Sequence, residues 1–119
     1  MAKIIDRRIP LDGEDDFLDV HLVIERRSVI GFSLNYTSVI GGEHRVVCRY
    51  DTCHGHLHVH RNWLDRGEPE DLEDPAAGKS TYNEKLTLAE RDLQENWRDY
   101  RAKMELKMAR PPDRPETIE

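Results

Sequence analysis

The chain has 119 residues and a formal net charge of −6, with 35% charged and 37% hydrophobic residues. This length allows one modest hydrophobic core, and the negative charge argues against a protein that coats nucleic acid without specificity. No run approaches the roughly 20 apolar residues of a transmembrane helix, so we expect no membrane partner. Residues 1–10 lack the apolar core of a signal peptide, and two cysteines do not make a disulfide framework. We therefore expect a reduced, cytoplasmic protein.

Alternating apolar and polar side chains predict four strands, over residues 17–25, 29–38, 44–50 and 56–63. A period of two with one apolar face is typical of a half-buried strand. Residues 3–9 are a weaker candidate for a fifth strand. Because the links between these segments are short, we predict a four- to five-stranded antiparallel β-meander with one face in the core.

The alternation also predicts which side chains of the third strong strand share a face. The predicted core-facing residues are Val46, Cys48 and Tyr50. The residues predicted on the opposite face are Arg45, Val47 and Arg49. In residues 56–63 the same rule places Leu57 and Val59 on one face and the histidines on the other.

One long C-terminal helix should cover the apolar face of this sheet. Thr87 and Glu90 have the spacing of a capping box, although a start one turn earlier, near Asn83, also fits. Pro111 and Pro112 would end the helix. Apolar residues recur at steps of three and four; these are Leu86, Ala89, Leu93, Trp97, Tyr100, Met104 and Met108.

The predicted class is therefore α+β, with the β-meander packed against the long helix. We expect residues 1–109 to form a single domain. An acidic, irregular loop, residues 64–80, would lie inside this domain, because it is rich in acidic residues and holds Gly and Pro. Residues 110–119 should be a disordered tail.

Residues 49–63, R-Y-D-T-C-H-G-H-L-H-V-H-R-N-W, contain four of the six histidines and are where we place the functional site. On a strand, alternate side chains share a face and lie roughly 6.5 Å apart. His56, His58 and His60 therefore line one face, and His54 lies in the turn before them, near Asp51. His21 and His44 are isolated in the sequence.

One chemistry that this stretch supports is metal binding. Imidazole is a common ligand for zinc, copper, iron and nickel. The predicted metal ligands are His54, His56, His58 and Asp51. Three protein ligands and an open position would suit a catalytic divalent metal such as zinc.

A second chemistry needs no metal. Imidazoles can share general acid and base duties near neutral pH. In this hypothesis His54 and His58 are the acid and the base, Asp51 orients one of them, and Arg49 binds a phosphate. The predicted substrate-binding residues are Arg45 and Arg61. The alternative for the arginines is ordinary surface charge on the sheet.

A third hypothesis is a non-catalytic interaction module. The helix or the acidic loop would then bind a protein partner, and a sheet edge or the remaining helix surface would support a homodimer. In that case the histidines have no direct role.

Two motifs resemble those of known families. Residues 49–58, R-Y-D-T-C-H-G-H-L-H, are similar to the R-Y-D-T-A-H-G-x-x-H motif of a family of small uncharacterised bacterial and archaeal proteins. Residues 89–100 are similar to that family's D-L-x-E-N-W-x-x-Y helix. The resemblance implies that Asp51, His54 and His58 are the matching site positions.

The R-Y-D core is also similar to TumE-type toxins of toxin–antitoxin systems. Local charge and the motif together lead to our main hypothesis. It is a small toxin-like or defence-associated protein that acts on RNA or nucleotides, as a ribonuclease or phosphoester hydrolase.

Overall fold

The computed structural model describes residues 1–52, 55–64, 70–72 and 81–109. Six strands pair antiparallel in the order β1-β2-β3-β4-β5-β6, and one helix follows them. The elements are β1 (Lys3–Asp12), β2 (Asp16–Glu25), β3 (Ser28–Ile40), β4 (Glu43–Asp51), β5 (His58–Arg61), β6 (Glu70–Asp71) and α1 (Tyr82–Ala109).

The predicted α+β class, with an antiparallel meander and one long C-terminal helix, is confirmed. The very short β6 lies within the stretch predicted to be an irregular loop, so that part of the prediction is wrong. Residues 65–69 and 73–80 of the predicted acidic loop lie outside the described residues, and so does the predicted tail, 110–119. No helix in the described part of the chain is both long and apolar enough to cross a membrane.

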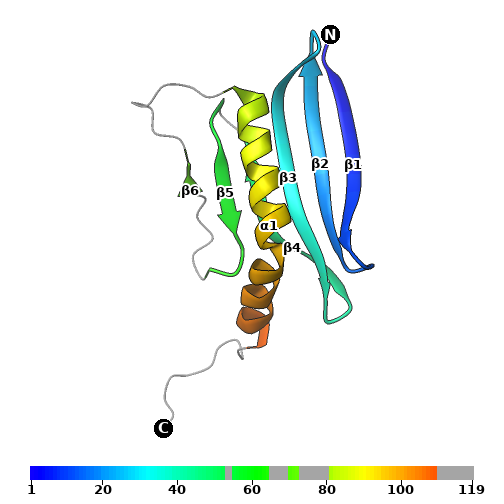
Figure 1. Ribbon diagram of the computed structural model, residues 1–119, viewed down its shortest axis with the longest axis vertical. Coiled ribbons are helices and arrows are strands. Elements are labelled where there is room, and N and C mark those ends of the chain that lie inside the picture. The colour runs from blue at the N-terminus through cyan, green and yellow to red at the C-terminus, as the bar shows by residue number, and fades with distance from the viewer. Residues whose placement is uncertain (53–54, 65–69, 73–80, 110–119) are drawn as a thin grey trace.

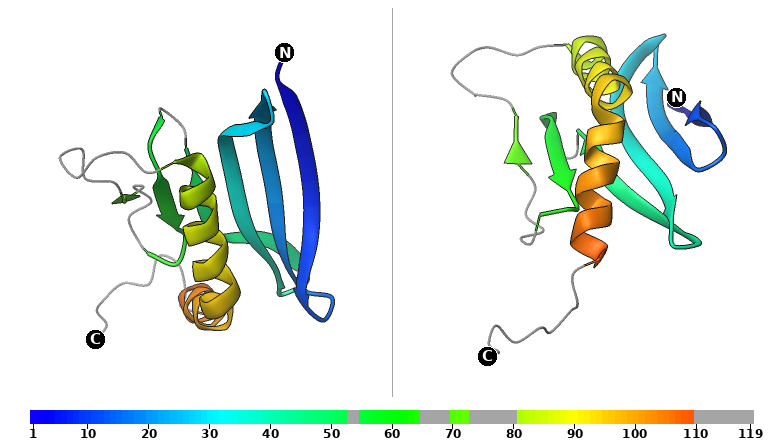
Figure 2. Two further views of the ribbon diagram at one scale, coloured as in Figure 1. Left: turned by 45° about the horizontal axis from the view of Figure 1, so that its top comes forward. Right: turned by 60° about the horizontal axis from the view of Figure 1, so that its bottom comes forward.

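The helix α1 lies against one face of the curved sheet. In Figure 1 it runs in front of β4, with β1 to β3 on one side and β5 and β6 on the other. The views of Figure 2 show the same arrangement. No described helix or strand covers the other face, which we call the helix-free face.

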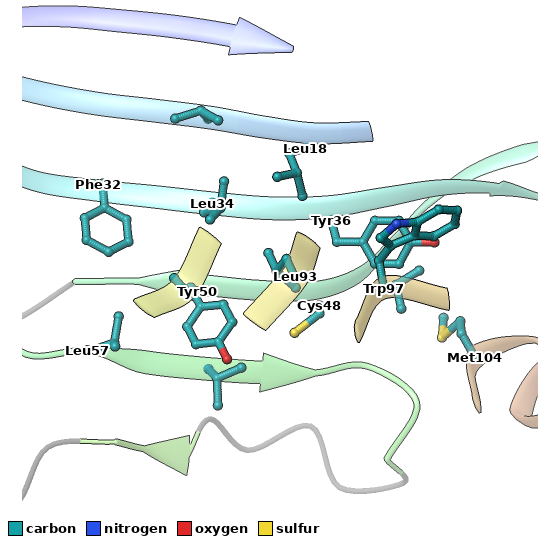
Figure 3. Packing of buried hydrophobic residues seen from close by; sticks show 14 of the residues in the cluster. Leu18, Phe32, Leu34, Tyr36, Cys48, Tyr50, Leu57, Leu93, Trp97 and Met104 are labelled. Atoms are coloured by element: carbon teal, nitrogen blue, oxygen red, sulfur yellow. The ribbon is translucent and has the colours of Figure 1, made fainter. Parts of the chain in front are cut away.

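The core lies between α1 and the sheet, and Figure 3 shows its side chains. The predicted helical stripe is confirmed: Ala89, Leu93, Trp97 and Met104 are buried, and Leu86, Tyr100 and Met108 pack partly buried against them. On the sheet side the fully buried residues include Leu18, Leu34, Tyr36 and Val59. Both apolar patterns of the sequence therefore meet in one core.

A buried carboxylate fixes the helix on the sheet. Asp16 accepts hydrogen bonds from the Tyr36 hydroxyl at 2.6 Å and from the Ser38 hydroxyl at 2.7 Å. Arg101 of α1 donates to the same carboxylate at 2.9 Å and also to the carbonyl of Val39 at 3.3 Å. Because these buried polar groups satisfy one another, the cost of burying them is offset.

A bulge in β4 changes the predicted faces of that strand. The pairing of β4 with β3 skips Val47, so one extra residue stands in β4. Val47 is completely buried, whereas Val46 is 37% exposed, and the predicted positions of these two valines are therefore wrong. The register places Arg45 opposite Ser38, on the helix side, so Arg45 and Arg49 do not share a face.

The capping box of α1 lies six residues before the predicted one. The Thr81 hydroxyl accepts from the Glu84 backbone N–H at 3.1 Å, and the Glu84 carboxylate accepts from the Thr81 N–H at 2.8 Å. Thr87 lies inside the helix, which begins at Tyr82. The earlier of the two starting points considered from the sequence is thus the closer one.

Replacing Thr81 with alanine should lower the free energy of unfolding by about 1 kcal/mol, because the cap would lose its side-chain acceptor. The matched control is Thr87→Ala, at an exposed position inside the helix. There, alanine's higher helix propensity should raise stability by a few tenths of a kcal/mol. Urea unfolding followed by circular dichroism measures both. A larger loss in Thr87→Ala than in Thr81→Ala would contradict this assignment of the cap.

Candidate active site

The side chain of Tyr50 points toward α1, and this shows which side chains of β4 lie on the opposite, helix-free face. The Tyr50 hydroxyl donates to the Asp92 carboxylate of α1, which also accepts from the Tyr100 hydroxyl. Burial and these hydrogen bonds raise the pKa of both tyrosines, so they remain neutral donors. Because successive strand residues point to opposite faces, Arg49 and Asp51 lie on the helix-free face.

The neighbouring strand β5 brings two histidines to the same place. Val59 is buried in the core, so His58 and His60 on either side of it point to the helix-free face. The register sets His58 directly opposite Asp51 and His60 directly opposite Arg49. The ring of His56 lies against that of His58, with centroids 4.3 Å apart.

The Asp51 carboxylate is shared by two imidazoles and a guanidinium. Its Oδ1 lies 3.8 Å from His58 Nδ1, and its Oδ2 lies 3.4 Å from His60 Nε2 and 3.3 Å from Arg49 Nε. The Asp51 side chain is 11% exposed and that of Arg49 is 47% exposed. A sheltered carboxylate thus lies beside both rings, while the cation remains accessible to an anionic ligand.

The predicted substrate arginines do not gather around Asp51. Arg45 lies on the helix side and pairs with Glu43 at 3.2 Å. Arg61 lies opposite Cys48, also on the helix side, and its guanidinium pairs with Glu70. Of the three predicted arginines, only Arg49 lies beside Asp51 on the helix-free face.

Among the predicted histidines, the structure brings His58 to Asp51 and places His56 next to it. His54, predicted as both an acid–base residue and a metal ligand, lies outside the described residues. His60 was not assigned an acid–base role from the sequence, yet it approaches Asp51 more closely than His58 does. The alternation of the histidines was the signal for His60, since it shares a face with His58.

Metal binding stays a prediction. Within residues 1–52, 55–64, 70–72 and 81–109, no three His, Cys, Asp or Glu side chains converge in a way that could hold a metal ion. The described members of the predicted ligand set, Asp51, His56 and His58, therefore do not form such a group by themselves.

Two rows of polar residues cross the helix-free face from β1 to β5, and the candidate site lies where these rows end, on β4 and β5. Cross-strand pairing aligns the first row as Asp6, His21, Ser33, Asp51 and His58. It aligns the second row as Arg8, Asp19, Asn35, Arg49 and His60. His21, isolated in the sequence, is thus a neighbour of the site, and its Nδ1 lies 2.6 Å from Asp6 Oδ1.

A comparison with models of known protein families shows which family this chain belongs to. The model for "Domain of unknown function (DUF7718)" matches residues 6–109. The chain belongs to this family. The match agrees with the expectation of an uncharacterised family, and it includes every element from β2 to α1 as well as most of β1. Searches of curated proteins and of solved structures found no match.

Cys48 belongs to the core and is not part of the candidate site. It is fully buried on the helix side of β4, as its alternation with Tyr50 predicted. Burial, and to a lesser extent the charge of Asp92, raises the pKa of the thiol to about 12. Because the thiolate is the nucleophilic form, Cys48 should be inert in the folded protein.

Labelling with a thiol reagent at pH 8 tests whether the Cys48 thiol is inert in the folded protein. In a Cys53→Ser variant, Cys48 is the remaining cysteine, and it should react many times faster in denaturant than in buffer. The pKa of the Cys48 thiol in the folded protein lies above the ordinary value of 9.0. The contribution of the buried, neutral thiol to the free energy of unfolding is therefore complete below pH 9.0. The contribution is lost as the pH rises toward 12. Equally rapid labelling of the folded variant would contradict the assignment.

Proposed function

We propose that the protein cleaves RNA by general acid–base catalysis, using His58 and His60 as the proton-transfer pair. The observation that carries the proposal is the single Asp51 carboxylate within 3.8 Å of one imidazole and 3.4 Å of the other. A carboxylate placed beside a histidine ring can orient that ring for proton transfer. Here one carboxylate would orient two rings.

The two rings approach Asp51 through different nitrogens. His58 turns Nδ1 to the carboxylate, and His60 turns Nε2 to it. The other nitrogen of each ring is the one that is not turned toward the carboxylate. His58 Nε2 and His60 Nδ1 are therefore the atoms that would exchange protons with the substrate.

The reaction is an internal transfer at phosphorus. The more exposed imidazole, His60, removes the proton from a ribose 2′-hydroxyl, and the 2′-oxygen forms a bond to phosphorus. The bond from phosphorus to the 5′-oxygen breaks, and His58 gives its proton to that oxygen. The products are a 2′,3′-cyclic phosphate and a 5′-hydroxyl, and water can then open the cyclic phosphate with the proton transfers reversed.

Arg49 completes the site as the phosphate-binding group. Its side chain is half exposed, so its N–H groups can reach the non-bridging phosphate oxygens while Nε stays near Asp51. Charge-assisted hydrogen bonds from a guanidinium suit the phosphate geometry and stabilise the charge that develops during transfer. The exposed guanidinium of Arg49 is the group of this site that would contact the anionic substrate.

We place this activity in a toxin-like or defence-associated protein, whose cleavage of cellular RNA would stop growth. This placement is supported by the R-Y-D stretch, which supplies Arg49 and Asp51 of the site. It extends the sequence-based hypothesis by giving His60 the role first considered for His54.

The test is incubation of the purified protein with fluorescent single-stranded RNA in the presence of EDTA. We expect cleavage that leaves 2′,3′-cyclic phosphate ends, and none of a matched oligonucleotide whose sugars lack the 2′-hydroxyl. Intact RNA under all conditions would refute the proposal. Cleavage that EDTA abolishes and zinc restores would refute the metal-free mechanism and favour the metal-binding hypothesis.

A further inference from the structure

The polar rows form a cleft on β1, β2 and β3, next to the candidate active site. The cleft has a volume of about 380 Å³, and the members of the two rows that line it are Asp6, Arg8, Asp19, His21, Ser33 and Asn35. Ser33 is the direct neighbour of Asp51, and Asn35 is the direct neighbour of Arg49. Since strands lie about 4.8 Å apart, the β2 side of the cleft is roughly 10 Å from Asp51.

Arg8 provides a planar surface in this cleft. Its guanidinium lies over the ring of Phe17, 4.7 Å from the centroid. Asp19 holds the guanidinium through two hydrogen bonds, of 2.6 Å to Nε and 3.0 Å to Nη2, and Thr37 steadies Asp19 at 2.9 Å. The Arg8 side chain is nevertheless 48% exposed. A guanidinium fixed in this way is a platform on which a nucleobase can stack.

Asn35 provides a hydrogen-bonding group beside that platform. Its Oδ1 is buried but accepts no hydrogen bond from any residue that the structure describes. An unsatisfied buried acceptor is unfavourable and gains from a donor that reaches it. The amino group of adenine or cytosine is such a donor, and Asn35 lines the cleft in which that base would lie.

We infer that this cleft is a nucleobase-binding subsite, which holds the nucleotide on the 5′-oxygen side of the phosphate bound at Arg49, the side that leaves on cleavage. The inference rests on the proposed function and names its substrate class as single-stranded RNA of at least two nucleotides. The base stacks on Arg8 and its amino group donates to Asn35. A base in a duplex could not be splayed onto the sheet in this way.

Binding and cleavage are measured separately to test the subsite. Binding uses fluorescence anisotropy with a short adenine- and cytosine-containing oligonucleotide that lacks 2′-hydroxyls and cannot be cleaved. Cleavage compares kcat/KM for the RNA version with that for hydrolysis of a nucleoside 2′,3′-cyclic phosphate. The variants are Arg8→Lys, which keeps the charge but removes the plane, and Asn35→Leu. The control is Arg91→Lys, on α1.

Each cleft variant should weaken oligonucleotide binding about 5- to 100-fold, the range found when a base loses its stacking partner. Hydrolysis of the cyclic phosphate, which does not extend into the cleft, should change less than about twofold in these variants. In Arg91→Lys, oligonucleotide binding and both kcat/KM values should change less than about twofold. Unchanged binding in both cleft variants would overturn the subsite. An equal loss of kcat/KM for the RNA oligonucleotide and for the nucleoside 2′,3′-cyclic phosphate would also overturn it.

The outcomes also separate the subsite from the proposed function. Oligonucleotide binding that depends on Arg8 and Asn35, without any cleavage of RNA, would support the subsite and refute the catalytic proposal. Cleavage of RNA at an unchanged rate in both cleft variants would support the catalytic proposal and refute the subsite. Arg8→Lys preserves an ion-pair partner for Asp19, and circular dichroism would show whether each variant is folded.

Discussion

Replacing Trp97 with alanine should lower the free energy of unfolding by about 3–5 kcal/mol, the usual cost of truncating a large buried aromatic residue. Trp97 is 7% exposed and lies at the centre of the α1 stripe. Its ring meets that of Tyr36 edge to face, with centroids 5.9 Å apart. Figure 3 shows the two side chains together between the helix and the sheet.

Chemical unfolding of Trp97→Ala measures this loss, with Leu106→Ala as the control. Leu106 is on the same helix but is 70% exposed, so its truncation should change stability by no more than about 0.5 kcal/mol. A small domain is stable by only about 5–15 kcal/mol, and Trp97→Ala would therefore be partly unfolded near body temperature. Similar losses in the two variants would show that Trp97 does not anchor the helix to the sheet.

The parts of the fold that were predictable from the sequence depend on local periodicity. Leu18 and Leu34 repeat every second residue with their neighbours, and both are buried as the alternation indicates. Leu93 and Trp97 are four residues apart and face the same sheet. Because burial of apolar side chains is the main favourable term in folding, these two periods were enough to predict the strands, the helix and their packing.

The bulge at Val47 could not be predicted in this way. Strand faces alternate with a period of two, so one extra residue exchanges the faces of everything beyond it. Val46 and Val47 have the same side chain, and the local pattern holds no sign of which one lies inside. The wrong face for Arg45 follows directly, because Arg45 lies beyond the bulge and was therefore expected on the same face as Arg49.

The start of α1 was ambiguous for a related reason. Thr81 with Glu84 and Thr87 with Glu90 have identical capping-box spacing. Packing decides between them, since the helix continues back to bury Lys85 before Ala89. A local motif predicts that a helix begins nearby, and only the tertiary contacts select the residue.

The residues of the site were predictable as a group but their pairs were not. The sequence indicates that Asp51 lies near several histidines. Which ring meets the carboxylate depends on the register between β4 and β5, and this register sets His58 opposite Asp51. The pairing of His21 with Asp6 likewise depends on the register of β1 with β2, which no short motif encodes.

Replacing either His58 or His60 with alanine should reduce kcat/KM for RNA by about 10²–10⁴-fold, because each ring transfers one proton in the proposed step. Asp51→Asn keeps the size of the side chain but removes the charge that both rings share, and it should cause a loss in the same range. Rates measured on one RNA substrate give all three values. His44→Ala is the control, since His44 is exposed at the far end of β4.

The way these losses combine distinguishes a shared carboxylate from three independent groups. If Asp51 acts only by orienting His58 and His60, adding Asp51→Asn to the double variant His58→Ala with His60→Ala should cause little further loss, as for catalytic residues that act as a unit. Independent roles would instead multiply the two losses. Loss in only one of the histidine variants would mean that the other ring is not part of the proton-transfer pair. In that case His54, the acid–base partner first indicated by the sequence, becomes the residue to replace next.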